Sequence, residues 1–459
     1  MSGSAGPDAL RPLAEVPVDP DRGRVYEHGW QSWSPTTVHP VGGTGHRAVR
    51  PAMQIMCYRP GRPGPARGFQ GEGVLAVDPG TGEPARLYAA RDGLTGVPSI
   101  RAELVERRMV VSADDPDGVE QTLVRGPVQV GLASWAERLA ARAEVGPLRR
   151  APAVWCSWYH YFTEVTQADV LENLEALGTR RLPVEVIQID DGWQAEVGDW
   201  RSLSGRFSSL ADLVGRIGDG GRRAGLWIAP FLVGARSELA RDHPDWLVAG
   251  ADAGRNWDQE LFALDVTHPD AAAYLRRVFE TLRGWGFDYF KLDFIYAGAL
   301  EGRRWRDVDA LAAYREGLAL IREAVGPDAY LVGCGAPILP SVGLVDAMRV
   351  SADIALDFEP AGGDLSRPSQ RAAALSVIGR AWQHGRLWVN DPDCLILRPA
   401  VQRREQWART VERYGGLRAS SDRIADLDDW GLATTRRLLA SVPPPVPFTP
   451  TPAPAASRP

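Results

Sequence analysis

The stretch Asp288-Tyr-Phe-Lys-Leu-Asp-Phe294 is an apolar, strand-like run that carries a lysine and ends in a carboxylate. Amphipathic segments flank it on both sides. Residues 270–284 have apolar side chains at helical spacing before a stop at Gly284, and residues 308–325 repeat the pattern. A buried strand between two helices is typical of a parallel sheet covered by helices. We therefore expect an α/β fold around this stretch.

The same rhythm recurs through residues 151–441. Strands are predicted at residues 153–158, 184–190, 225–230, 288–293, 329–334, 346–351, 386–390 and 416–420. Another helix is expected to begin at Thr166-Gln-Ala-Asp169, which has the spacing of a capping box with Asp in place of Glu. Eight strands in about 290 residues favour a closed (β/α)8 TIM barrel.

The rest of the 459 residues leaves room for a smaller domain. Residues 25–134 contain short alternating segments broken by Gly and Pro, which predict an antiparallel, partly formed β-sandwich. Residues 135–150 are expected to form a linker. The lead at residues 1–24 and the Pro-rich tail at residues 442–459 are expected to be disordered or extended.

Composition excludes several classes of function. The chain is 44% hydrophobic and 24% charged with a formal net charge of −6, so no basic surface is expected to bind nucleic acid. The amino terminus lacks the pattern of a secretory signal, and no apolar run has the length of a membrane span. A cytoplasmic protein without a membrane partner is the expectation. The four cysteines show no CxxC or Cys/His spacing, which predicts free thiols and no zinc site. Neither a metal nor a cofactor is expected.

Polar residues gather where the predicted strands end, and in a barrel such positions face the active site. Acidic residues follow the second, fourth, sixth, seventh and eighth strands: Asp190, Asp191, Asp293, Asp353, Asp391, Asp393 and Asp422. Such a mouth suits hydroxyl recognition, cation binding or both. The sixteen tryptophans add flat faces of the kind that cover the C–H side of a sugar ring, although most would serve equally as core.

The residues alone leave the roles of these groups open. Asp293 and Asp353, with Lys291 and Arg349 near them in sequence, could be a nucleophile and a proton donor or two structural ion pairs. Asp391 and Asp393 favour a turn over a metal site. His160 has no evident partner for a catalytic triad, so a supporting, hydrogen-bonded role is expected.

Three further tryptophans are equally ambiguous: Trp193, Trp200 and Trp246 could pack the barrel or act as sugar platforms.

Six motifs occur together in this chain: Trp155-Cys-Ser-Trp-Tyr159, Ile187-Gln-Ile-Asp-Asp-Gly-Trp193, Phe290-Lys-Leu-Asp-Phe294, Gly333-Cys-Gly335, Arg349-Val-Ser-Ala-Asp353 and Leu387-Trp-Val-Asn-Asp-Pro-Asp-Cys-Leu395. In order and kind of spacing they resemble the glycoside hydrolase family 36 α-galactosidases, or melibiases. The resemblance extends from about Val25 to about Leu438.

The resemblance implies a role for each matching residue. Asp293 is implied as the nucleophile and Asp353 as the acid/base. The residues implied to contact substrate are Asp190, Asp191, Lys291, Arg349, Trp158, Trp227, Cys334 and Trp33. Of these, Cys334 would be a pocket wall, and Trp33 would reach the rim from the amino-terminal domain.

Elementary electrostatics agrees with these roles. Lys291 shares a strand face with Asp293, so its ammonium would favour an ionised nucleophile. A direct ion pair between Arg349 and Asp353 would lower the pKa of the acid, so Arg349 is expected to point at substrate. Asp190 and Asp191 are consecutive and can face the same way only if the strand has already turned.

The expected function is a retaining exo-α-galactosidase acting on melibiose- or raffinose-type oligosaccharides through a covalent galactosyl-aspartate. The alternatives are an α-galactosyl transferase of the raffinose-synthase type and an α-N-acetylgalactosaminidase. More distant ones are a metal-dependent barrel enzyme using Asp190, Asp191, Asp391 or Asp393, and a sugar-binding protein without catalysis. Compared with the family pattern, the β-sandwich looks shortened and a carboxy-terminal β domain is missing. An exposed barrel flank would then favour marginal stability or a homo-oligomer.

Overall fold

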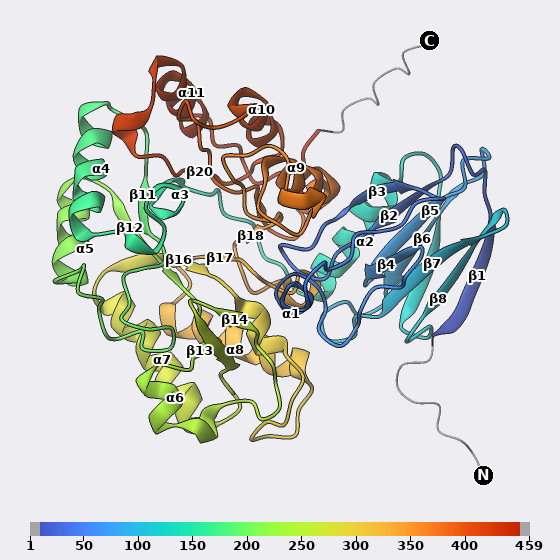
Figure 1. Cartoon of the computed structure of the whole chain (residues 1–459), viewed down its shortest axis with the longest axis horizontal. Helices are drawn as coiled ribbons and strands as arrows, with labels where there is room; N and C mark the ends of the chain where they lie inside the picture. Colours follow the sequence, from blue (N-terminus) through green and yellow to red (C-terminus); the bar gives the residue numbers. More distant parts are fainter. Residues whose placement is uncertain (1–9, 450–459) are drawn as a thin grey trace.

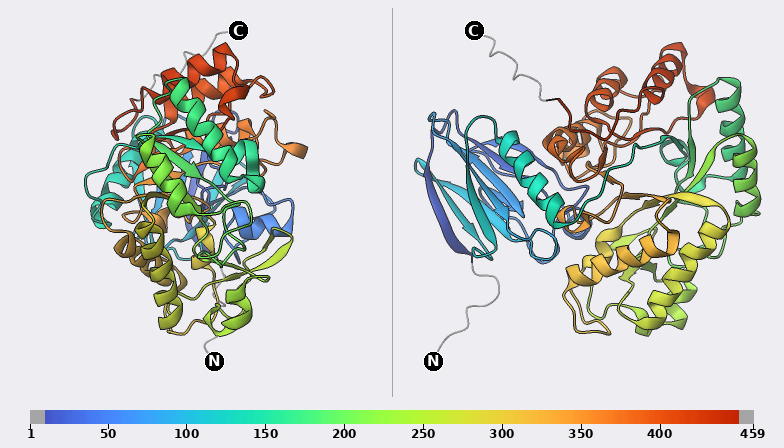
Figure 2. Two further views of the ribbon diagram at one scale, coloured as in Figure 1. Left: turned by 90° about the vertical axis from the view of Figure 1, so that its left-hand side faces the viewer. Right: turned by 180° about the vertical axis from the view of Figure 1, so that it is seen from behind.

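The computed structural model describes residues 10–449 and has two parts (Figure 1). A β domain built from the first third of the chain packs against one side of a larger α/β barrel. Figure 2 shows from behind that the β domain is a two-layered sandwich with one helix, α2 (Val128–Arg142), on the side of the barrel.

The β domain contains two antiparallel sheets. The outer sheet has the order β1-β8-β7-β4 and the inner sheet the order β3-β2-β5-β6-β9. Their strands are β1 (Arg11–Pro17), β2 (Arg24–Glu27), β3 (Thr37–Pro40), β4 (Phe69–Glu72), β5 (Val74–Asp78), β6 (Ala85–Ala90), β7 (Ser99–Val105), β8 (Arg108–Ala113) and β9 (Val119–Val124).

Alternation along the inner sheet places its two faces in two different cores. Val25, Leu75 and Val77 point into the sandwich, where they join a cluster with residues of the outer sheet. Tyr26 and Ala76, one residue out of phase, belong instead to the cluster that includes the barrel. The β domain is therefore continuous with the barrel core rather than tethered to it.

The barrel has eight parallel strands in the order β19-β18-β17-β16-β12-β11-β10-β20. Leu417 N and Leu395 N donate across the two end strands, to Asn390 O at 3.0 Å and to Ala419 O at 2.6 Å, which closes the seam. The strands are β10 (Ala153–Cys156), β11 (Val186–Ile189), β12 (Arg223–Ile228), β16 (Phe287–Leu292), β17 (Tyr330–Gly333), β18 (Ala347–Arg349), β19 (Val389–Asp391) and β20 (Arg418–Ser420). The predicted barrel and amino-terminal β domain are confirmed.

Helices surround the barrel. They are α3 (Trp158–Tyr161), α4 (Gln167–Thr179), α5 (Leu210–Asp219), α6 (Glu238–Asp242), α7 (Pro269–Gly284), α8 (Ala310–Val325), α9 (Gln370–Gly379), α10 (Arg404–Tyr414) and α11 (Asp429–Leu439). The predicted capping box of α4 is present, since Thr166 Oγ1 accepts from Asp169 N and Asp169 Oδ2 accepts from Thr166 N. Within residues 10–449, no helix combines the length and apolar character needed to cross a membrane.

Two insertions reach over the mouth of the barrel. One is α1 (Pro51–Cys57), which the β domain contributes between β3 and β4. The other is a small antiparallel sheet that follows β12, made of β13 (Leu232–Gly234), β14 (Arg255–Asn256) and β15 (Gln259–Ala263).

Several expected boundaries were wrong. Part of the supposed extended lead, Arg11–Pro17, is strand β1 and pairs with β8, while residues 1–9 lie outside the described residues. The supposed linker at residues 135–150 begins inside α2. In the supposed disordered tail, Phe448 stacks on His384 with ring centroids 4.0 Å apart, and residues 450–459 are again outside the description.

Candidate active site

A cavity of about 350 Å³ opens at the carboxyl ends of the barrel strands. Barrel loops, α1 and the β14–β15 hairpin all contribute to its wall. The lining residues are Trp33, Met53, Met56, Cys57, Trp158, Thr163, Asp190, Asp191, Trp227, Asn256, Trp257, Lys291, Asp293, Phe294, Ala352, Asp353, Ser366 and Pro368.

Eight of the ten site residues predicted from the sequence line this one cavity. They are Asp190, Asp191, Lys291, Asp293, Asp353, Trp33, Trp158 and Trp227. The other two, Cys334 and Arg349, are buried and are not part of its lining. The four cysteines are free thiols, as predicted.

Asp293 is held at the end of β16 by contacts to both carboxylate oxygens. Trp227 Nε1 donates to Oδ2 at 2.9 Å and Phe294 N donates to Oδ1 at 2.8 Å. Phe294 reaches this position with φ of 50°, a left-handed conformation that costs a non-glycine residue free energy. The turn therefore fixes the direction of the carboxylate.

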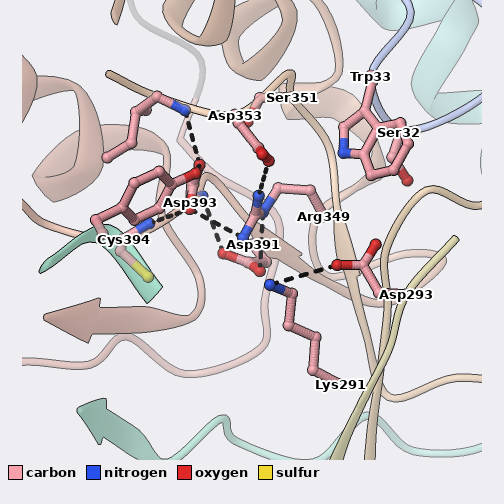
Figure 3. A network of polar contacts seen from close by, with 12 residues as sticks. Ser32, Trp33, Lys291, Asp293, Arg349, Ser351, Asp353, Asp391, Asp393 and Cys394 are labelled. Atoms are coloured by element: carbon pink, nitrogen blue, oxygen red, sulfur yellow. Dashed lines mark hydrogen bonds and ion pairs between the residues drawn. The ribbon is translucent and has the colours of Figure 1, made fainter. Parts of the chain in front are cut away.

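Lys291 connects Asp293 to Asp190. Its Nζ lies 3.5 Å from Asp293 Oδ2 and 3.1 Å from Asp190 Oδ2 (Figure 3 shows the Asp293 contact). Burial opposes the charge of Lys291, but Asp190 and Asp293 outweigh it and hold the pKa well above its ordinary value. The predicted juxtaposition of an ammonium and Asp293 is present.

Asp191 also lies on the cavity wall with both oxygens engaged. Gln194 Nε2 donates to Oδ1 at 2.6 Å and Trp257 Nε1 donates to Oδ2 at 2.7 Å. Burial raises the pKa of Asp191 to about 6, although these two hydrogen bonds oppose the rise. Strand β11 ends at Ile189, so the chain has already turned and both Asp190 and Asp191 reach the cavity.

Arg349 does not have the surroundings expected of it. Its guanidinium lies 3.1 Å from Asp353 Oδ1, 3.2 Å from Asp391 Oδ2 and 2.9 Å from Asp393 Oδ1 (Figure 3). The expectation that Arg349 avoids Asp353 and points at substrate was wrong. Two of its partners, Asp391 and Asp393, follow a different strand, which sequence proximity could not reveal.

Asp353 nevertheless keeps the character of an acid. Burial raises the pKa of Asp353 to about 7, the charge of Asp393 adds to the rise, and Arg349 opposes it. The ion pair is too weak to reverse the shift because Arg349 is shared among three carboxylates. The side chain is 33% exposed, so a molecule in the cavity can reach it.

The structure also shows where the residues of ambiguous role lie. Trp193, Trp200 and Trp246 are buried and do not line the cavity, so they pack the barrel. His160 Nδ1 faces Asp426 at 3.6 Å, outside the cavity. Asp391 and Asp393 both pair with the guanidinium of Arg349, whose positive charge offsets that of the carboxylates.

Sequence reasoning missed the residues contributed by the two insertions. Met53, Met56 and Cys57 come from a seven-residue helix that is too short to show a period. Asn256 and Trp257 belong to a hairpin whose turn has positive φ at Trp257 and Asp258, which no glycine announces. Trp33 Nε1 is buried with no hydrogen-bond partner among the described residues.

Comparisons with known proteins agree with this geometry. The family model described as Melibiase matches residues 147–318. The α-galactosidase TtGalA of Thermus thermophilus, solved in complex with stachyose, is 31% identical, with 95% of each chain covered and a TM-score of 0.77. The GH36 α-galactosidase AgaA of Geobacillus stearothermophilus shares the fold at 14% identity and a TM-score of 0.61, over 93% of this chain and 61% of that one.

Alignments with curated sequences are more local. The bifunctional α-galactosidase/sucrose kinase AgaSK of Mediterraneibacter gnavus is 31% identical over 102 residues, which make up 20% of this chain and 10% of that protein. The chain therefore matches only a small part of the length of such relatives.

Proposed function

Because this chain belongs to the melibiase family of glycoside hydrolases, family 36, we propose that it is an exo-acting α-galactosidase. It removes terminal α-galactosyl residues with retention of configuration, by two successive displacements. The proposed substrates are oligosaccharides of the melibiose and raffinose type, in line with the stachyose complex of the Thermus thermophilus relative.

The observation that supports this proposal is the contrast between two carboxylates of one cavity. Asp293 faces the Lys291 ammonium at 3.5 Å and accepts two further hydrogen bonds. Asp353 has a pKa raised to about 7, chiefly by burial. A retaining glycosidase needs this division between an anionic nucleophile and a protonated acid.

In the first step, Asp293 attacks the anomeric carbon while Asp353 transfers its proton to the glycosidic oxygen. The bond to the leaving group breaks and a β-galactosyl ester of Asp293 forms. In the second step, Asp353, now a carboxylate, takes a proton from water as the water attacks the same carbon. Galactose leaves as the α-anomer, and Asp353 has regained its proton.

The galactosyl ring is proposed to lie among the groups beside Asp293. Asp190 and Asp191 accept hydrogen bonds from hydroxyls, and Lys291 donates. Trp227 and Trp158 offer flat faces to the C–H side of the ring. Each of these side chains lines the cavity.

The test is hydrolysis of 4-nitrophenyl α-galactoside by wild type, by Asp293→Gly and by Asp353→Ala. Asp293→Gly is expected to lose activity and to recover it with azide, yielding β-galactosyl azide because azide takes the place of the missing carboxylate. Asp353→Ala is expected to give the α-azide, since azide then intercepts the galactosyl ester. An Asp293→Gly enzyme with undiminished activity would refute the nucleophile assignment.

A further inference from the structure

Helix α1 forms one wall of the catalytic cavity. It lies between the β domain and the barrel (Figure 1). Met53, Met56 and Cys57 all line the cavity. The Cys57 thiol lies 3.8 Å from Ser366 O, and a side chain at Gly254 would lie 3.7 Å from Met56 Cγ. The helix therefore spans from the loop after Asp353 to the loop that carries Trp257.

This wall borders the side of the cavity where a leaving group must lie. A general acid has to be within hydrogen-bond reach of the glycosidic oxygen, so the leaving group sits next to Asp353. Ser366 and Pro368 follow Asp353 along the same loop and line the cavity with it. The charged groups proposed to hold galactose lie elsewhere, since Asp190 and Asp191 follow β11 and Lys291 lies on β16.

The chemistry of the wall is apolar. Met53, Met56, Ala352 and Pro368 offer only carbon and thioether sulfur. The hydroxyl of Ser366 is already engaged, since its Oγ donates to Asp364 Oδ1 at 2.6 Å. The charged residues of the lining are those assigned to galactose and to catalysis: Asp190, Asp191, Lys291, Asp293 and Asp353.

Methionine suits a surface that must adapt to different apolar shapes, because its side chain is unbranched and polarizable. Met53 and Met56 are both partly buried against the main core, so one part of each side chain is anchored and another faces the cavity. If the leaving group were a sugar, several of its hydroxyls would lie against this wall without hydrogen-bond partners from the protein.

We propose that Met53 and Met56 form an apolar subsite for the leaving group and raise kcat/KM for α-galactosides whose leaving group is a long alkyl chain. This inference rests on the proposed galactosidase function. Oligosaccharides remain substrates because the galactosyl side of the cavity is unchanged.

The test compares kcat/KM for hexyl and methyl α-galactoside. Both release a simple alcohol, and the two alcohols are of nearly equal acidity, so the ratio reports contact with the alkyl chain rather than the ease of bond cleavage. In wild type, hexyl is expected to exceed methyl by on the order of tenfold, which is the effect of burying about two methylene groups. Met53→Gln/Met56→Gln is expected to reduce this ratio to near one, because the amides favour water over the alkyl chain.

Two controls isolate the effect. Met53→Leu/Met56→Leu keeps an apolar wall and is expected to retain most of the ratio, which shows that any loss comes from polarity. Leu123→Gln makes a similar change on β9 of the same domain, at a side chain that is 66% exposed and away from the cavity. It is expected to leave the ratio at the wild-type value.

The outcomes separate the two proposals. Wild type that hydrolyses neither alkyl galactoside nor melibiose overturns the galactosidase function itself. Wild type that hydrolyses both galactosides with a ratio near one overturns only the apolar subsite. A high ratio that survives the double glutamine substitution also overturns it, by showing that other residues hold the alkyl chain.

Discussion

Asp353 is expected to lose its catalytic proton near neutral pH. Its pKa is raised to about 7, so the proton needed in the first step is present below that pH and lost above it. We predict that kcat/KM for melibiose falls as pH rises through about 7, approaching tenfold per pH unit. A pH profile of initial rates measures this, and a profile that stays flat to pH 9 would contradict the assignment.

A substitution at Asp393 tests why the pKa of Asp353 is raised. Its charge raises the pKa of Asp353. Asp393→Asn removes the charge and leaves Arg349 facing Asp353 more fully, so the falling limb should move to lower pH. A limb that stays in place or moves to higher pH would show that the charge of Asp393 does not raise the pKa of Asp353.

Trp257 offers a second prediction at the residue scale. Its Nε1 donates to Asp191 Oδ2 at 2.7 Å and favours the carboxylate form. Trp257→Phe removes the donor, so the pKa of Asp191 should rise above about 6 and galactoside binding should weaken near neutral pH. KM should rise because a larger fraction of Asp191 is then protonated, and a protonated carboxyl accepts hydrogen bonds from hydroxyls less strongly.

The pH dependence of KM distinguishes a raised pKa of Asp191 from a general loss of packing around residue 257. The KM defect of Trp257→Phe should be larger at pH 6 than at pH 8, where Asp191 is ionised in either enzyme. Trp305→Phe changes the same residue type at a side chain that is 64% exposed and outside the cavity. It should leave KM unchanged at both pH values.

Single residues were predictable where a strand end fixes them. Asp293 and Lys291 could be placed because the period of a strand puts alternate residues on one face. Arg349 could not, because its environment depends on Asp391 and Asp393, which enter from the neighbouring strand. The balance of charges around a buried guanidinium is a property of the assembled barrel mouth.

Among the helices, α4 has an amino-terminal capping box whose contribution to stability can be measured. Thr166 and Asp169 exchange hydrogen bonds at its amino end, at 3.1 and 2.9 Å. Thr166→Ala removes one of them and should destabilise the helix by about 1 kcal/mol. Hydrogen exchange of the α4 amides should then be about fivefold faster.

Thr166→Ser is the control, because its hydroxyl can still accept from Asp169 N. It should exchange at nearly the wild-type rate. Equal exchange in the alanine variant would mean that packing of Val170 and Leu177, both buried, holds the helix without the cap.

Elements differed in how much their sequences revealed. The barrel strands are buried on both faces, so they appear as continuous apolar runs and all eight were found. The short helix α1 and the β14–β15 hairpin depend on contacts with the rest of the protein. Their own sequences are too short to show a helical or strand-like period. These are the elements that complete the cavity wall.

At the scale of the whole molecule, Arg380 joins the two domains. It is fully buried, and no carboxylate among residues 10–449 pairs with it. Its guanidinium donates to Ser32 O at 2.8 Å, Gln31 O at 2.8 Å and Gly29 O at 3.3 Å in the β domain, and to Val350 O at 2.9 Å in the barrel. The segment that carries Trp33 is thus anchored beside the strand that carries Arg349.

We predict that Arg380→Met destabilises the protein by about 3 kcal/mol or more, since several buried carbonyls lose their donor. Because Trp33 would also lose its anchor, KM for galactosides should rise more than kcat falls. Chemical denaturation and steady-state kinetics measure the two effects. Arg241→Met, at an exposed surface ion pair, should leave both stability and kinetics essentially unaltered.

The division into a β domain and a barrel could be predicted from the sequence, because short alternating segments give way to apolar strands separated by amphipathic helices near residue 151. The junction between them did not, because Arg380 and the Gly29–Ser34 segment are distant in sequence and carry no local signal. The expected extended lead and linker failed for the same reason. β1 pairs with β8, and α2 packs on β6 and β9 of the β domain and on Ala381–Gln383 of the barrel.

The proposed mechanism requires that galactose becomes covalently attached to Asp293. Brief reaction of the wild-type enzyme with a fluorinated α-galactosyl fluoride that slows the second step, followed by denaturation, digestion and mass spectrometry, tests it directly. We expect one added fluorogalactosyl group on the peptide that contains Asp293, and none on the same peptide of Asp293→Asn. Attachment to another residue, or turnover with no attached sugar at any time, would contradict it.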